Sequence, residues 1–233
     1  MSVQSKFRDL GIIDYKEAWD LQEQLFEEVV AAKLYNRAHP DAKKPVVNHL
    51  LFCEHPHVFT LGKSGAPSNL LITDELLEKI DAKFYKINRG GDITYHGPGQ
   101  IVGYPIFDLE ALGLGIREYI HLLEEAIIST LADLGIAASR LDGATGVWLD
   151  VDQPQKARKI SAIGVRASRF VSMHGFAFNV NTNLDYFRHI NPCGFIDKGV
   201  TSLEKELGAA QSMDAVKALL LKKLSAAFGL SLA

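Results

Sequence analysis

The segment RGGDITYHGPGQ, residues 89–100, is the most informative stretch of this sequence, with four glycines among twelve residues. Glycines let a backbone approach a ligand closely and expose its N–H groups. The segment contains neither the GxGxxG pattern nor the lysine of a P-loop, so it is not a nucleotide-binding motif. A hairpin with glycine turns and the wall of a binding site both fit it. The neighbouring Arg89, Tyr95 and His96 favour the binding wall.

Helical and strand-like patterns extend on both sides of this segment. Capping residues and apolar periodicity predict helices over about 15–36, over 116–134 and from Ser212 to Gly229. Strand-like runs occupy 46–53, 84–88, 101–109, 146–151, 159–166 and 173–180. Pro105 indicates that its run is an edge strand or contains a bulge. Strands interrupted by few helices predict an α+β fold in which helices flank a mixed or antiparallel sheet.

The composition is typical of a folded globular protein. Of the 233 residues, 47% are hydrophobic and 23% are charged, which excludes disorder as the main state. The net charge of −3 argues against general nucleic-acid binding. Because no run approaches the roughly 18–20 apolar residues of a membrane span and no apolar signal core is present, we expect a cytoplasmic protein without a membrane partner. We expect one catalytic domain over 1–233, with a small C-terminal lobe from about residue 185 as an alternative organisation.

The two cysteines have opposite contexts. Cys53 ends an apolar run and is expected in the core as an inert residue. Cys193 lies in the sequence NPCG, where proline and glycine indicate a sharp turn that can present a nucleophilic sulfur, although a structural role fits this residue alone equally well. Two cysteines cannot supply the paired CxxC spacing of a zinc site, and His55-Pro56-His57 is better explained as a turn than as a metal pair. We therefore expect no metal and no other cofactor.

A nucleophilic thiol needs a neighbouring cation. At the reference pKa of about 8.5, only about 3% of a thiol is ionised at pH 7. The candidates for lowering the pKa of the Cys193 thiol are Lys159, His189, His96 and His174. Lys159 begins a strand-like run, and by position alone it is more typical of a solvated edge charge.

Positive charge is concentrated in one part of the chain. Residues 153–184 contain no aspartate or glutamate but five basic residues: Lys156, Arg158, Lys159, Arg166 and Arg169. A solvated charged face explains this excess, and so does a landing site for an acidic partner, whose approach the complementary potential would accelerate. The sequence alone leaves both interpretations open.

Together these residues resemble the lipoyl(octanoyl) transferase family. The resemblance covers most of the chain and rests on an ordered set of motifs: EHP (54–56), TLG (60–62), RGGDITYHGPGQ (89–100), GYP (103–105), GVW (146–148), KISAIGVR (159–166), HGFA (174–177) and NPCG (191–194). No single motif is specific, but their order is. The loop at 35–45 is longer than the family's minimum and contains none of them.

The resemblance implies the fold of biotin and lipoate protein ligases and an acyltransferase activity. The implied reaction transfers an octanoyl group from octanoyl-acyl carrier protein to a lysine of a lipoyl domain, in endogenous protein lipoylation. The implied acceptors are the lipoyl domains of 2-oxo-acid dehydrogenase complexes and the glycine cleavage H protein. No nucleic acid takes part.

The resemblance also implies roles for individual residues. The cysteine of the NPCG motif, Cys193, would carry the acyl group as a thioester, and the lysine of the KIxAIG motif, Lys159, would lower the pKa of its thiol and act as acid and base. Substrate contacts would fall on Arg89, Gly90, Gly91, Asp92, Ile93, Thr94, Tyr95, His96, Ala162, Ile163, Gly164, Gly175, Phe176 and Ala177.

Three other functions compete with this interpretation. A ligase of the same fold that activates lipoate with ATP needs no cysteine nucleophile and would leave the NPCG sequence unexplained. A non-catalytic module that binds carrier protein or lipoyl domain would tolerate loss of Cys193. A cysteine hydrolase is the third alternative, and the sequence supports it least, because no acidic residue stands at a recognisable spacing from a histidine.

Overall fold

The computed structural model describes residues 3–191 and 199–232, and a mixed sheet of nine strands forms its centre. The strand order is β12-β1-β2-β6-β10-β9-β8-β7, with β11 paired to β9. The bounds are β1 (Val3–Ile12), β2 (Asn48–Glu54), β6 (Gln100–Ile106), β7 (Ser139–Leu141), β8 (Ala144–Leu149), β9 (Arg158–Ser168), β10 (Val171–Asn179), β11 (Gly199–Val200) and β12 (Leu230–Leu232). Parallel pairs (β1–β2, β1–β12, β9–β11) accompany antiparallel ones, so the predicted α+β fold with a mixed sheet is confirmed.

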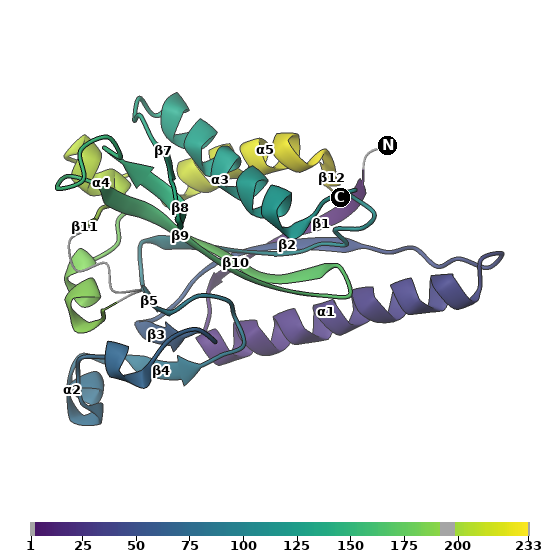
Figure 1. The fold of residues 1–233 in the computed structure, drawn as a ribbon, viewed down its shortest axis with the longest axis horizontal. Helices are drawn as coiled ribbons and strands as arrows, with labels where there is room; N and C mark the ends of the chain where they lie inside the picture. The colour runs from purple at the N-terminus through teal and green to yellow at the C-terminus, as the bar shows by residue number, and fades with distance from the viewer. Residues whose placement is uncertain (1–2, 192–198, 233) are drawn as a thin grey trace.

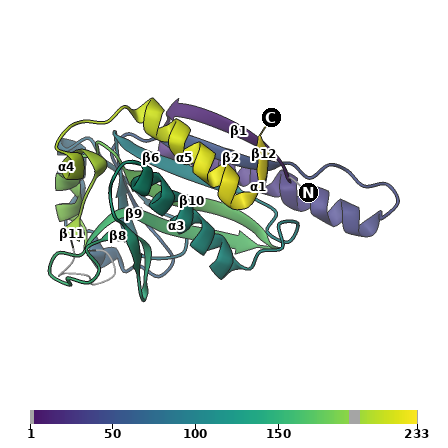
Figure 2. The ribbon, with the colours of Figure 1, turned by 90° about the horizontal axis from the view of Figure 1, so that it is seen from above.

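Helices cover both faces of this sheet (Figure 1). Helix α1 (Tyr15–Ala38) lies on one face, and α3 (Ile116–Asp133) and α5 (Met213–Phe228) lie side by side on the other (Figure 2). Two short helices, α2 (Asp74–Lys79) and α4 (Leu203–Leu207), lie at the end of the molecule remote from the C-terminal end of α1. Within the described chain, no helix is both long and apolar enough to cross a membrane.

A second, smaller sheet lies on the same side of the large sheet as α1 (Figure 1). It contains β3 (Val58–Leu61), β4 (Lys83–Lys86) and β5 (Ile93–His96) in the order β4-β3-β5. Strand β5 lies inside the glycine-rich segment 89–100, for which the sequence left a hairpin with glycine turns and a binding wall open and assigned no strand bounds. Its four residues are too few for a visible alternation, and pairing with β3 decides their conformation.

The predicted helices are confirmed, with their caps. The Asp14 side chain accepts a hydrogen bond from Lys16 N at the start of α1, and Ser212 accepts one from Ala215 N at the start of α5. Gly135 and Gly229 follow α3 and α5 with positive φ, as helix-ending glycines do. Each helix buries its apolar stripe against the sheet: Leu123 and Ile127 of α3 are fully buried, and so is Leu220 of α5.

Of the two explanations for Pro105, an edge strand or a bulge, the edge strand is wrong. Strand β6 pairs with β2 on one side and with β10 on the other. A proline is tolerated there because the β6–β10 ladder ends at Gly103, before Pro105. Beyond that point the Ser172 hydroxyl donates to Pro105 O (2.9 Å) and accepts from Phe107 N (3.0 Å), which replaces the missing ladder bonds.

The C-terminal part of the chain packs into the same core as the rest. Val216 and Leu224 of α5 join Leu123 of α3 and Phe178 of β10 in one hydrophobic cluster. Strand β12 extends the large sheet by pairing in parallel with β1.

Close packing at Gly175 generates a prediction about stability. A Cβ at this position would collide with the backbone carbonyl of Gly103 on the neighbouring strand, and a backbone atom cannot move aside cheaply. We expect Gly175→Ala to lower the free energy of unfolding by about 1–3 kcal/mol, the usual cost of overpacking, in urea denaturation. Gly115→Ala is the matched control, since a Cβ there meets nothing within 4 Å and should cost less than about 1 kcal/mol. Equal losses in the two variants would contradict the packing argument.

Candidate functional site

The glycine-rich loop between β4 and β5 is held by the side chain of Arg89. Its guanidinium donates to the backbone carbonyls of Gly90 (2.8 Å), Asp92 (2.8 Å) and Thr60 (3.2 Å), which lie in the loop and in β3. A Cβ at Gly164 would come within 2.7 Å of this guanidinium and 3.0 Å of Gly90 O, so a larger residue there would force the Arg89 side chain to shift. Arg89, expected to contact substrate, therefore also fixes the shape of the loop.

A cavity of about 550 Å³, here called the outer chamber, opens between this loop and strands β8 and β9. It brings together most of the predicted site residues from distant parts of the sequence. Those that line it are Arg89, Gly90, Gly91, Asp92, Ile93, Thr94, Lys159, Ala162, Ile163 and Gly164. Trp148, Ile120 and Phe187 add apolar surface that sequence patterns did not assign to the site.

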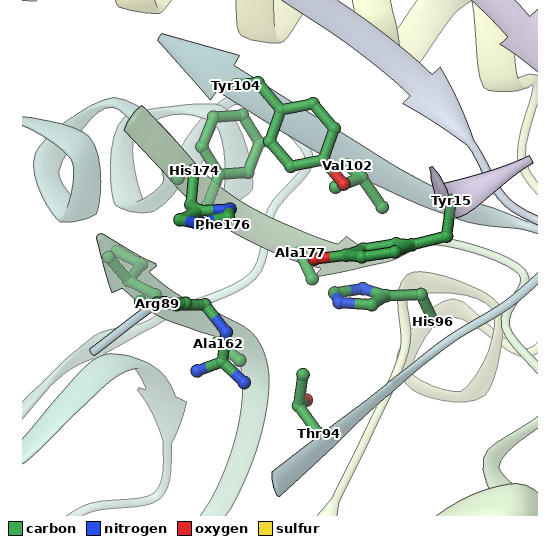
Figure 3. A pocket seen from close by; sticks show the side chains of 13 residues that line it. Tyr15, Arg89, Thr94, His96, Val102, Tyr104, Ala162, His174, Phe176 and Ala177 are labelled. Carbon is green, nitrogen blue, oxygen red and sulfur yellow. The ribbon is translucent and has the colours of Figure 1, made fainter. Parts of the chain in front are cut away.

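A smaller cavity of about 40 Å³, the inner chamber, adjoins the outer one, because Arg89, Thr94 and the Ala162–Gly164 stretch line both. Four more of the predicted residues, His96, Gly175, Phe176 and Ala177, line the inner chamber. Figure 3 shows the Tyr15 and His96 rings stacked against each other on one side of it. Their centroids are 5.9 Å apart. Tyr15, Val102, Tyr104 and His174 complete the lining. The sequence placed Tyr15 only at the start of the first predicted helix, since no local pattern places a helix start against the glycine-rich segment.

Tyr95 is the one described residue of the predicted set that lines neither chamber. Its neighbours in β5, Thr94 and His96, point to the chambers, and strand alternation turns Tyr95 to the other face. There its ring stacks on Tyr186 (centroids 4.8 Å apart), and its hydroxyl lies 2.7 Å from His57 Nδ1.

Lys159 lies at the outer chamber, with its ammonium near a carbonyl and an aromatic ring. Nζ donates to Thr145 O (3.1 Å) and lies 4.6 Å from the centroid of the Trp148 ring. Cys193 lies outside the described residues, and of the NPCG motif only Asn191 is described. Asn191 N donates to Asn69 O (2.8 Å). The pairing of Lys159 with Cys193 stays a prediction.

Two buried histidines, His96 and His174, line the inner chamber, and the buried His55 ring lies 5.9 Å from that of His96; burial favours the neutral form of all three. Burial lowers the pKa of His96 to about 3 and that of His174 to about 3, with nearby Arg89 adding to both effects. Burial lowers the pKa of His55 to about 4, although a hydrogen bond to Ile13 O opposes the change. His174 adopts φ 61°, and its Nε2 lies 2.8 Å from Asn88 Oδ1. The neutral rings therefore contribute polar but uncharged groups to the inner chamber, beside the guanidinium of Arg89.

Cys53 and the two histidines around Pro56 belong to the structural framework. Cys53 is fully buried, and burial raises the pKa of its thiol far above the usual value, so the prediction of an inert core residue is confirmed. His55 contacts the Tyr104 hydroxyl (2.7 Å) on one side of the strand end, while His57 contacts the Tyr95 hydroxyl. Among the residues that the structure describes, no three His, Cys, Asp or Glu side chains group as metal ligands would.

The basic residues of 153–184 have separate environments. Arg158 forms ion pairs with Glu206 (2.7 Å) and with Asp150. These pairs raise the pKa of Arg158 and balance its charge within the protein. Arg166 lies 3.9 Å from Glu23 and packs over the Phe26 ring. The predicted acidic-partner surface therefore cannot include Arg158 as an unpaired charge.

Known proteins similar to this chain share its sequence along nearly the whole length. Residues 14–225 match the family model of the lipoyl protein ligase A/B catalytic domain. The octanoyltransferase of Cytophaga hutchinsonii is 57% identical over 223 residues, which cover 95% of this chain and 91% of the relative. The octanoyltransferase of Flavobacterium johnsoniae is 55% identical over 229 residues, or 98% of each chain.

Solved structures of ligases share the fold. A bipartite lipoate protein ligase from Thermoplasma acidophilum superposes with a TM-score of 0.72 at 14% identity, covering 99% of this chain and 86% of the ligase. The ATP-bound lipoate-protein ligase A gives a TM-score of 0.66 at 15% identity, over 100% and 88% of the two chains. A biotin protein ligase from Aquifex aeolicus gives 0.53 at 13% identity, over 96% and 70%. The predicted biotin and lipoate ligase fold is confirmed.

The three neutral histidines predict a pH dependence of stability. Below about pH 6.5 the unfolded chain binds protons at these residues, while the folded chain does not until their pKa values of about 3 to 4 are reached. Stability must therefore fall as the pH falls through this window, by up to about 1.4 kcal/mol per pH unit for each histidine.

Urea unfolding between pH 7 and 5 measures this slope. His174→Asn should reduce the slope by about one histidine's share, because asparagine tolerates the left-handed backbone and does not titrate in this range. His121→Gln, at an exposed position, should leave the slope unchanged. A wild-type stability that is flat from pH 7 to 5 would show that these histidines are charged in the folded protein.

Proposed function

The chain belongs to the lipoyl protein ligase A/B catalytic domain family and is an acyltransferase, and we propose that it transfers an octanoyl group from octanoyl-acyl carrier protein to a lysine of lipoyl domains. The observation that carries this proposal is the likeness to octanoyltransferases over almost the whole chain. The acceptors under this proposal are lipoyl domains of 2-oxo-acid dehydrogenase complexes and the glycine cleavage H protein.

The two chambers support an acyl substrate of linear shape. Small residues, Ala162, Gly164, Gly175 and Ala177, line the passage where the chambers meet and the inner chamber beyond. Ile163, Val102 and Phe176 supply apolar walls. Removing a methylene group from water contributes about 0.8 kcal/mol, so an alkyl chain gains several such increments by entering.

The proposed first half-reaction forms an acyl-enzyme. The Cys193 thiolate, stabilised by the Lys159 ammonium, attacks the thioester carbonyl of the donor. A bond forms between this sulfur and the acyl carbon, the bond to the carrier's sulfur breaks, and the departing thiolate takes a proton from Lys159. Lys159 is then neutral. Its place at the outer chamber, where predicted substrate residues of 89–94 and 162–164 converge, supports this role.

The second half-reaction returns the enzyme to its starting state. The acceptor amine attacks the acyl carbon of the Cys193 thioester, and neutral Lys159 removes the proton that the amine loses. The bond from carbon to the Cys193 sulfur breaks, which regenerates the thiolate beside an ammonium. One lysine serves both half-reactions, and no ATP is consumed, in contrast to a ligase that forms an acyl-adenylate.

Acylation of Cys193 is the first prediction of this proposal. Incubation with octanoyl-acyl carrier protein should add one octanoyl group to the wild-type chain, and peptide mass spectrometry should locate it on Cys193. Cys193→Ser should remove the adduct and reduce transfer by at least about 10³-fold, because a serine hydroxyl is far less ionised than a cysteine thiol and is a weaker nucleophile. Cys53→Ala is the matched control and should keep both the octanoyl adduct and the transfer activity. An unmodified wild-type mass with a competent donor would exclude a covalent mechanism.

The Lys159 ammonium supplies a second prediction. Lys159→Ala should raise the pKa of the Cys193 thiol, so that its alkylation by iodoacetamide at pH 7 slows by about tenfold or more and its pH profile moves upward. Lys156→Ala removes an exposed positive charge nearby in sequence and should leave the profile unchanged. Identical pH profiles of alkylation for the wild type and Lys159→Ala would show that Lys159 does not lower the pKa of the Cys193 thiol.

A further inference from the structure

A continuous path of buried hydrogen bonds connects His96 of the inner chamber with the strand that carries Lys159. We propose that Gln100 and Asn179 are positioning residues in this path, which fix the proton of His96 on Nδ1 and hold the Lys159 strand in register with the chambers. The consequence for catalysis rests on the proposed function. Neither of these two side chains lines a chamber, so their effect on the reaction is exerted through their neighbours.

The first half of the path lies at the turn between β5 and β6. His96 Nδ1 lies 2.9 Å from Gln100 Oε1. The amide nitrogen of Gln100 donates to Tyr95 O (3.2 Å) and to Asn179 Oδ1 (2.9 Å) in β10. Every heteroatom of the Gln100 amide is thus engaged by β5 and β10.

The second half of the path reaches the backbone of β9. Asn179 Nδ2 donates to Thr201 O (3.0 Å), and Thr201 N donates to Lys159 O (2.9 Å). Immediately before Thr201, Val200 of β11 pairs with Lys159 in parallel register. Asn179 therefore binds the residue that fastens β11 to the Lys159 position.

Two backbone carbonyls, Tyr95 O and Thr201 O, determine the direction of the side-chain hydrogen bonds in the path. Thr201 O can only accept, so the amide nitrogen of Asn179 must face it and the amide oxygen must face Gln100. Tyr95 O likewise requires the nitrogen of Gln100, which leaves Gln100 Oε1 toward His96. An oxygen at that position needs a donor, and this assigns the proton of neutral His96 to Nδ1.

The other ring nitrogen of His96 then carries a lone pair. His96 Nε2 lies 3.4 Å from Thr60 Oγ1, so the Thr60 hydroxyl is the donor in this contact. Thr60 Oγ1 in turn accepts from Arg89 Nη2 (3.4 Å). Donors thus point in one direction from Arg89 to the backbone of Lys159.

Burial makes this path costly to break. The exposed fractions are 6% for His96, 1% for Gln100, 4% for Asn179 and 0% for Thr201. In a low-dielectric interior an unpaired amide pays its full desolvation cost, and aligned bonds polarise one another. The path is therefore suited to hold His96 of the inner chamber and the backbone of Lys159 at a fixed position relative to each other.

The position of the proton on His96 tests the direction of the path without any activity assay. Long-range ¹H–¹⁵N correlation spectra should show wild-type His96 neutral and protonated at Nδ1. Gln100→Met, which keeps the side-chain shape but removes the acceptor, should move the proton mainly to Nε2, where Thr60 Oγ1 can accept it. A wild-type proton on Nε2, or an unchanged Nδ1 proton in Gln100→Met, would overturn the assignment.

Amide exchange and kinetics test the positioning role. Asn179→Leu should accelerate hydrogen exchange of Thr201 N–H by at least about tenfold, and lower kcat by about tenfold or more with less than about a twofold change in KM for the octanoyl donor. Asn48→Leu is the matched control: Asn48 is a fully buried asparagine of β2 whose Oδ1 accepts from Asp108 N (2.8 Å), away from the path. It should lose stability but keep Thr201 protected and kcat within about twofold.

The two variants together separate the alternatives. If Asn179→Leu affects Thr201 exchange and kcat no more than Asn48→Leu does, the positioning role is wrong. If the wild type transfers no octanoyl group while His96 and Thr201 behave as expected, the proposed function fails and the hydrogen-bond path stands.

Discussion

The close approach of the glycine-rich loop to strand β9 is the constraint on which the site depends. The Arg89 guanidinium holds the loop through backbone carbonyls, and Gly164 leaves the space that this guanidinium occupies. The same contact brings residues 89–94 against 162–164, and Arg89, Thr94 and residues 162–164 line both chambers. Without it, residues about 70 positions apart in the sequence would not meet, and no chamber would lead toward Lys159.

Local patterns predicted the parts of this structure that local forces decide. Asp14 and Ser212 cap their helices because a side-chain oxygen satisfies a free N–H wherever the chain bends in this way, and Gly135 and Gly229 end helices for an equally local reason. Strand β5 and the central position of Pro105 depend on partners distant in sequence. The periodicity of apolar residues along the sequence does not indicate which strands are neighbours in the sheet.

The site shows the same division. The ordered motifs identified the residues of the chambers, but Tyr95, counted among them, faces the opposite side of β5, and Tyr15 enters from the first helix. The roles of Gln100 and Asn179 arise only from tertiary contact, since one ends the glycine-rich segment and the other ends β10. Sequence thus indicates which segments form the chambers, while the fold decides which side chain of each segment lines them.

The fold is shared with a lipoate-protein ligase solved with bound ATP, so under the proposed function the activation of the acyl group without ATP is what would distinguish this chain from that ligase. The most direct measurement uses the acylated protein after its donor has been removed by gel filtration. The account predicts that this isolated protein octanoylates a lipoyl domain without ATP, in a single turnover that consumes the bound acyl group. Transfer that occurs only when ATP is added, or an isolated adduct that never reaches the lipoyl domain, would contradict it.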